Sequence, residues 1–324
     1  MASSSRRLIH LILDFDGTLT TTDTIALLAN AAYALHPQSP PPPPPPPAWQ
    51  QMASAYQADC TAHARQHTKP ELRTTVAAEA AFLASLLPVE RASIERIESA
   101  GIFAGLRPDD IARAAATTAP VRAGFWQDLC CGQVLGAGGA VDILSVNWSR
   151  VWIQSSLLAA ISTPSPSPSS PPLSSQGSEC KRFSSQIGIY CNDLVVCAST
   201  GLTTGQMTRE PVLGGNVGIW TAEHKEKMME HLVKKRRVAA EEEALTVYVG
   251  DSSTDLLCLL KADVGLVVGD GLDGTCARIG VKLTPAGPDH AIGRRGGGPP
   301  QQLLKVRGLE EIGRLLVKQE IKAP

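Results

Sequence analysis

The hydrophobic pattern of the chain begins with a continuous apolar run and continues into a long region of helical periodicity. Residues 8–15 (LIHLILDF) have the length and composition of a strand that is buried on both faces. From residue 24 to about 116, alanine-rich segments repeat their apolar positions at helical spacing and show no strand-like alternation. We therefore expect one strand followed by a block of helices.

Past this block, helical and strand-like segments alternate. In order along the chain they are a helix over 121–139, a strand over 140–146, a helix over 148–161, a strand over 187–196, a helix over 222–238, a strand over 244–250, a helix over 253–262 and a strand over 264–268. Such alternation is typical of an α/β protein with a doubly wound parallel sheet, a Rossmann-like core.

This pattern predicts a discontinuous core and an inserted module. We assign residues 1–24 and 117–324 to the α/β core, and 25–116 to a helical cap. Two low-complexity stretches interrupt them: 37–47, which contains eight consecutive prolines, and 162–185, which begins with a Ser/Pro-rich sequence and is expected to be a flexible loop. The segment 37–47 could bind a proline-reading partner, or either stretch could be a tolerated loop insertion.

Composition and charge exclude several classes of protein. Of the 324 residues, 43% are hydrophobic and 19% charged, which is typical of a globular protein. The formal net charge of −1 gives no indication of nucleic acid or an anionic membrane as a partner. The cysteines lack the paired spacing of a zinc site, and no apolar run has the length of a signal peptide or a membrane span. We expect a cytoplasmic protein with free thiols.

Polar residues follow several of the predicted strands, where a parallel sheet would expose them to one crevice. Asp14 and Asp16 follow the first strand, and Ser145 ends the strand over 140–146. The other members of the set are Lys225, near the start of a helix, and Asp251 and Asp255, directly after the strand over 244–250.

Four aspartates brought together would repel one another, because like charges ~4 Å apart cost on the order of 4 kcal/mol at an effective dielectric of 20. A hard dication relieves this repulsion, and Mg²⁺ prefers carboxylate oxygens together with water and phosphate. With the metal in place, one aspartate can attack phosphorus and the second can act as general acid.

The remaining polar groups suit phosphate. Ser145 can donate a hydrogen bond to a phosphoryl oxygen, and Lys225 can hold the phosphate beside the nucleophile. The amides around Gly17 offer a nest for the phosphate, since glycine permits a close approach.

The motifs DFDGTLT (14–20), Ser145 in LSVNWS, Lys225 and GDSSTD (250–255) resemble, in order, the four motifs of the haloacid dehalogenase (HAD) superfamily. The helical insert after the first motif is similar to the C1 cap of the phosphoserine-phosphatase-like subgroup. The resemblance implies Asp14 as nucleophile and Asp16 as acid/base. It implies that Mg²⁺ is held by Asp14, the Asp16 carbonyl and Asp251, and that Asp255 acts through a bound water or by contacting the metal ligands without binding the metal itself.

The resemblance also bears on the substrate. Asp23 occupies the position at which phosphoserine phosphatases carry an acidic residue for the substrate amine; a helix N-cap is the alternative. The sequence SVNWS (145–149) departs from the usual Ser-Gly-Gly-Phe and resembles a fungal branch of uncharacterised HAD-like hydrolases. Asn147 and Trp148 would line the substrate pocket, or pack at a helix start.

Together these features predict a magnesium-dependent phosphatase that hydrolyses a small phosphomonoester through an aspartyl-phosphate intermediate. Two alternatives stay open at this stage: a catalytically weak phosphate-binding or scaffold protein with the same fold, and a phosphotransferase whose acceptor is not water.

Overall fold

The structure is a computed structural model. It describes residues 8–36, 49–126, 129, 134–161, 184–214, 217–239, 244–287 and 302–317. The proline tract over 37–47 and nearly all of 162–185 lie outside the described residues, so the predictions of a flexible loop and of a proline-reading partner stay predictions.

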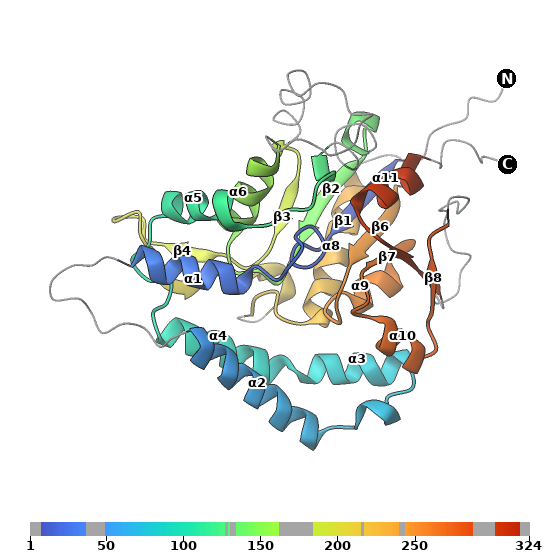
Figure 1. The fold of residues 1–324 in the computed structure, drawn as a ribbon, viewed down its shortest axis with the longest axis horizontal. Helices are drawn as coiled ribbons and strands as arrows, with labels where there is room; N and C mark the ends of the chain where they lie inside the picture. Colours follow the sequence, from blue (N-terminus) through green and yellow to red (C-terminus); the bar gives the residue numbers. More distant parts are fainter. Residues whose placement is uncertain are drawn as a thin grey trace.

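A seven-stranded sheet forms the centre of the molecule, in the order β3-β2-β1-β6-β7-β9-β8 (Figure 1). Its strands are β1 (Ile9–Leu13), β2 (Ala140–Leu144), β3 (Gly188–Tyr190), β6 (Leu245–Gly250), β7 (Val264–Val268), β8 (Lys282–Pro285) and β9 (Gln302–Val306). All neighbouring strands pair in parallel, with Leu11 of β1 opposite Val141 of β2 and Val247 of β6. The α/β fold class predicted from the alternating pattern is therefore confirmed.

The central strands are buried on both faces because helices cover each side of the sheet. Alternate side chains of β1 enter different cores: Leu11 and Leu13 pack into one, and Ile12 into the other. The first core includes residues of α1 (Ile25–Leu35), α5 (Pro108–Thr118), α6 (Arg150–Ala160) and α11 (Leu309–Val317). The second includes residues of α8 (Ala222–Ala239), α9 (Leu256–Lys261) and α10 (Asp273–Arg278).

Between β1 and β2 the described chain is mostly helical, with connecting turns and loops; Thr20, Ala104 and Val121 form isolated β-bridges. Besides α1 and α5 this segment contains α2 (Trp49–Gln66), α3 (Val76–Ser85) and α4 (Leu87–Ser99). In Figure 1 these three helices lie together at the bottom of the view, and α3 contacts α8 of the core. The division into a cap of residues 25–116 and a core stays a prediction.

The strand predicted over 187–196 is wrong as a single element. The chain forms β3, leaves the sheet, and then forms β4 (Leu194–Val196), which pairs antiparallel with β5 (Thr203–Met207) in a separate two-stranded sheet. The buried side chain of Asn192 lies at the break and binds the backbone of Val146 and Ile219. These contacts anchor the point at which the chain changes direction.

Two further elements differ from the sequence prediction. In the stretch expected to be a helix over 121–139, the described residues Phe125, Trp126, Leu129 and Val134 have π-helical rather than α-helical backbone, and a short 3₁₀ helix, Leu135–Ala137, follows them and ends at Gly138 with a φ of 82°. Beyond residue 268 the sheet continues with β8 and β9, and α10 and α11 flank it, none of which the pattern indicated.

Candidate functional site

The carboxyl ends of β1, β2 and β6 bring the predicted polar residues to one side of the sheet, as their parallel pairing requires. Asp14 follows β1 and its backbone N–H donates to the Val249 carbonyl in β6, which fixes the start of the turn. Asp251 follows β6 directly, and Asp255 begins α9. Lys225 lies in the first turn of α8.

Lys225 connects the two ends of the motif set. Its Nζ lies 2.6 Å from Oδ1 of Asp14 and 2.7 Å from Oδ1 of Asp255. The side chain is completely buried. Burial by itself would lower the pKa of Lys225, but the two carboxylates outweigh it and raise the pKa above its usual value. Lys225 therefore stays charged and neutralises part of the negative charge around it.

Three carboxylates remain close together beside this lysine. Asp14, Asp251 and Asp255 each offer a ligand oxygen, and these oxygens all lie within 4.8 Å of one another. Burial, followed by repulsion from Asp255, raises the pKa of Asp14 well above its usual value and that of Asp251 to about 6. The predicted convergence of Asp14, Asp251 and Asp255 is confirmed. The raised pKa values of Asp14 and Asp251 reflect burial first and repulsion between the carboxylates second, and a bound cation would offset both effects.

The three acids are not equivalent as ligands. Asp255 accepts hydrogen bonds from the hydroxyl of Tyr248 at 2.7 Å and from the backbone N–H groups of Asp251 and Ser252, in addition to Lys225. Asp14, in contrast, uses only Oδ1 for Lys225; no hydrogen bond within the described residues engages its Oδ2. Among the described residues, Asp14 thus keeps one oxygen available to a ligand, whereas both oxygens of Asp255 accept hydrogen bonds from neighbouring groups.

Gly17 is essential to this packing for a steric reason. Its φ is 76°, and a Cβ built at this position would lie 2.3 Å from Oδ2 of Asp251. On the adjacent residue, the Thr18 hydroxyl donates to Oδ1 of Asp251 at 3.2 Å. The structure therefore places Gly17 against a carboxylate; its predicted contact with phosphate stays a prediction.

The carboxylate of Asp16 lies outside the group of three acids. Its Oδ1 accepts from the backbone N–H of Thr24 at 2.7 Å and from the Thr24 hydroxyl at 2.6 Å, and its Oδ2 accepts from Nδ2 of Asn147 at 2.8 Å. Burial raises the pKa of Asp16, while the hydrogen bonds from Asn147 and Thr24 offset part of that rise. As a metal ligand Asp16 could therefore use only its backbone carbonyl, as the resemblance implied.

Asn147 is completely buried and joins the second motif to the first. Besides Asp16, its Nδ2 reaches the hydroxyl of Thr24 at 3.2 Å, which also accepts from the indole N–H of Trp152. Its backbone N–H donates to Oγ of Ser145 at 3.0 Å. Asn147 thus orients Asp16 and also links Ser145 to that acid.

Asp23 and Trp148 border a cavity of about 410 Å³ beside the site. Helix α1 begins at Ile25 with Thr24 as its N-cap, so Asp23 is not the N-cap that one alternative expected; its Oδ1 nevertheless accepts the Ile25 N–H at 2.8 Å. Trp148 meets Trp49 and Phe103 edge to face, each with ring centroids 6.0 Å apart. Trp148 therefore lines the cavity and also packs against other aromatic side chains.

Sequence reasoning missed two residues of this site. Tyr248 sits inside an apolar strand, where its hydroxyl gives no signal that it will bind Asp255. Thr24 lies in a run of threonines, TLTTTDT (18–24), that any turn could contain. Only the packing of distant segments selects these hydroxyl groups.

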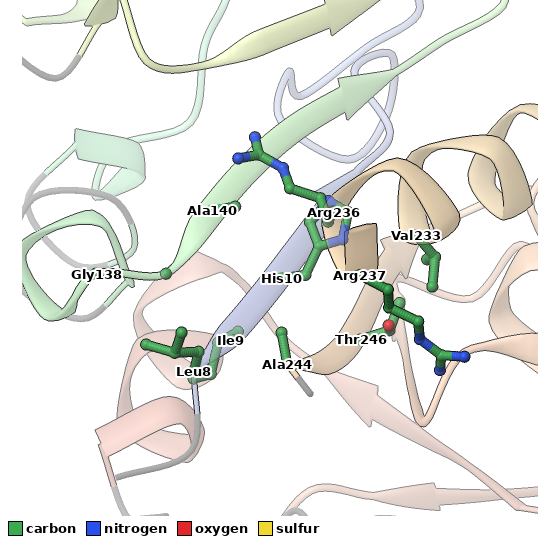
Figure 2. A pocket seen from close by; sticks show the side chains of 11 residues that line it. Leu8, Ile9, His10, Gly138, Ala140, Val233, Arg236, Arg237, Ala244 and Thr246 are labelled. Carbon is green, nitrogen blue, oxygen red and sulfur yellow. The ribbon is translucent and has the colours of Figure 1, made fainter. Parts of the chain in front are cut away.

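A separate hollow of about 90 Å³ lies at the opposite, amino end of the strands. Figure 2 shows His10 near the start of β1, with Arg236 and Arg237 at the end of α8 extending in different directions. His10 binds the buried Asp142 at 2.7 Å, and Arg236 lies 3.4 Å from the same carboxylate. Because the hollow lies at the amino end of the strands, it is not part of the acidic site.

Other features agree with the sequence reading where they can be compared. Within the described residues, Cys60, Cys191, Cys197, Cys258 and Cys276 are free thiols. Among those same residues, none of the helices combines the length and the hydrophobicity that crossing a membrane requires.

No family model matches the chain. It is similar to a CTO1 family protein of Schizosaccharomyces pombe, with 26% identity over 269 residues, which covers 79% of this chain and 80% of that protein. Its fold is similar to that of a HAD family hydrolase from Salmonella enterica subsp. enterica serovar Typhi, with a TM-score of 0.50, 12% identity, and coverage of 96% of this chain and 72% of the other. A phosphoserine phosphatase structure with a phospho-aspartyl intermediate analogue aligns with a TM-score of 0.47 and 14% identity, covering 94% and 97% of the two chains.

Proposed function

We propose that this chain is a HAD-type phosphomonoesterase that hydrolyses a small phosphoester through a phosphorylated Asp14. The observation that carries the proposal is that Asp14 and Asp16, two residues apart in one turn, lie in different environments. Asp14 binds Lys225 through one oxygen and has no hydrogen bond on the other among the described residues, whereas Asp16 lies two residues further on in a buried environment that raises its pKa. These are the properties that a nucleophile and a general acid need, respectively.

The residues present also fit Mg²⁺. Asp14 and Asp251 supply hard oxygen ligands within 4.8 Å of each other, and burial together with repulsion from Asp255 raises the pKa of both. The Asp16 carbonyl would complete the protein ligands, and Asp255 would support Asp251 through its backbone N–H. Bound there, Mg²⁺ would supply positive charge that lowers the repulsion between the carboxylates and a phosphate dianion.

In the first step, the free Oδ2 of Asp14 attacks phosphorus and the bond from phosphorus to the leaving-group oxygen breaks. Asp16 donates its proton to that oxygen, so the product leaves as a neutral alcohol. Lys225 favours the ionised form of Asp14 and holds the side chain in place, because it binds the other carboxylate oxygen.

In the second step, Asp16 takes a proton from water, and the resulting hydroxide attacks the phosphorus of the acyl phosphate. The bond between phosphorus and Asp14 breaks, which releases inorganic phosphate and restores both acids. Asn147 and Thr24 stabilise the ionised form of Asp16 that this step requires.

The test is the turnover of para-nitrophenyl phosphate with Mg²⁺ by the full chain and by Asp14→Asn. We expect activity that chelation abolishes and Mg²⁺ restores, and loss of at least about 10³-fold in Asp14→Asn, since the nucleophile is removed. Asp109→Asn, an exposed aspartate in the first turn of α5, is the matched control and should keep full activity. Acid-quenched wild-type protein should carry one phosphoryl group that hydroxylamine removes.

The outcomes separate the alternatives. Activity that persists in Asp14→Asn would refute a phosphorylated Asp14. Absence of turnover together with binding of phosphate would favour the phosphate-binding protein. Faster release of nitrophenol than of inorganic phosphate when an alcohol is added would favour a phosphotransferase.

A further inference from the structure

Several residues that line the cavity of about 410 Å³ are sequence neighbours of residues in the proposed catalytic site. Val146 and Trp148, which line it, flank Asn147, the residue that binds Asp16. Asp23 precedes Thr24, the other partner of Asp16, and Thr254 precedes Asp255. The leaving group of a phosphoester held at Asp14 would therefore enter this cavity.

The opposite wall comes from the helices that precede β2. Two residues of α1, five of α2 and four of α4 line it, mostly with apolar side chains: Ile25, Ala26, Trp49, Met52, Ala53, Tyr56, Gln57, Glu90, Ser93, Ile94 and Ile97. The volume of the cavity falls within the range of roughly 300–1,000 Å³ that is usual for small-molecule sites.

Three tryptophans contribute aromatic rings to the lining. Trp49, Trp148 and Trp220 all border the cavity, and the first two meet edge to face at 6.0 Å. Trp220 is only 6% exposed, and its indole N–H has no hydrogen-bond partner among the described residues. Flat apolar groups pack well between such rings, and cations are attracted to their faces.

The charged residues of the lining are all acidic. Asp23 and Glu90 border the cavity, whereas no lysine, arginine or histidine does so among the described residues. Glu90 receives the Tyr56 hydroxyl on Oε1 at 2.7 Å, and no hydrogen bond within the described residues engages Oε2. A leaving group with a carboxylate or a second phosphate would meet repulsion from Asp23 and Glu90, with no counter-charge among the described lining residues.

We propose that the natural substrate is a phosphomonoester of an aromatic or similarly flat apolar alcohol that carries no negative charge and presents an amine or another hydrogen-bond donor to Glu90. This inference rests on the proposed function, because it names the leaving group of the same reaction. It disfavours phosphoserine, whose carboxylate would find no cation in the cavity.

The test compares three aryl phosphates that differ only in one para substituent: phenyl phosphate, 4-(aminomethyl)phenyl phosphate and 4-carboxyphenyl phosphate. We expect kcat/KM to be highest for the aminomethyl compound and at least about tenfold lower for the carboxy compound, because the latter faces like charge in a poorly solvated site. Glu90→Gln keeps an acceptor for Tyr56 and should reduce the ratio of kcat/KM for the aminomethyl compound to that for the carboxy compound to about threefold or less. Glu95→Gln, exposed on the same helix, should leave the ratio unchanged.

A binding experiment tests the leaving-group preference of the cavity even if the protein does not turn over these substrates. The alcohols alone, 4-(aminomethyl)phenol and 4-hydroxybenzoate, are titrated against the intrinsic tryptophan fluorescence of wild type and of Trp49→Leu. We expect tighter binding of the amine in wild type and weaker binding of it in the variant.

Equal binding of the two alcohols, or a carboxy substrate as good as phenyl phosphate, would overturn the leaving-group assignment even if Asp14-dependent turnover is present. A ratio that Glu90→Gln leaves unchanged would overturn the part assigned to Glu90. Loss of all turnover with preserved preference for the amine would instead refute the proposed function and leave the cavity assignment standing.

Discussion

Replacing Lys225 by methionine removes the one charge that joins the two ends of the acidic site while keeping a long, helix-compatible side chain. The ammonium group lies 2.6 Å from Asp14 and 2.7 Å from Asp255, and it is completely buried. The variant leaves both carboxylates inside the protein without their shared partner.

The magnitude follows from these distances. Each contact corresponds to about 6 kcal/mol of Coulomb energy at an effective dielectric of 20. Much of this offsets desolvation, so breaking such a buried pair costs on the order of 3–5 kcal/mol in the free energy of unfolding. The pKa of Asp14, already raised mainly by burial, would rise further without Lys225. Because the folded state then holds a proton that the unfolded state has lost, the destabilisation grows as pH rises and shrinks in acid.

The assay is urea unfolding of wild type and variant at pH 5 and pH 8, without metal. Lys261→Met is the matched control: this lysine pairs with Glu226 and Glu230 on the surface and is 44% exposed, so its loss should cost less than about 1 kcal/mol at both pH values. A Lys225→Met penalty no larger than that of the control, or one that is the same at pH 5 and pH 8, would refute the reasoning.

Two further predictions concern other parts of the fold. Asp142→Asn should cost about 1.5–3 kcal/mol at pH 7; burial raises the pKa of Asp142, but the hydrogen bond with His10 outweighs it and holds the pKa below its usual value. The deficit in urea unfolding should therefore shrink as pH falls below about 4, the usual pKa of an aspartate, and vanish below the lower pKa of the folded state; a deficit that does not shrink in acid would contradict this. Gly17→Ala and Gly280→Ala share a positive φ near 75° and should each lose about 1 kcal/mol of stability, but only the former places a Cβ against Asp251 and should lose metal-dependent turnover. Equal turnover in the two variants would argue against the role of that contact.

Much of the architecture could be read from local patterns. The continuous apolar runs of β1, β6 and β7 mark strands covered on both faces, and the alternation with helices implies parallel pairing. Parallel pairing in turn places Asp14 and Asp251 at the same edge. The prediction failed where the local pattern is ambiguous. The run over 187–196 is apolar at both ends and could be one strand, but it contains Asn192, whose hydrogen bonds to remote backbone groups divide it.

By itself, the sequence determined the fold class, the order of the main elements and the meeting of the acids at one sheet edge, because periodicity and the rules of strand connection are local or topological properties. Only the tertiary structure decided that Asn147 and Thr24 hold Asp16, that Tyr248 holds Asp255, and that tryptophans with two carboxylates enclose the neighbouring cavity. Asn147 lies 131 residues from Asp16 along the chain, and such pairings depend on side-chain directions that are set when remote segments pack against one another.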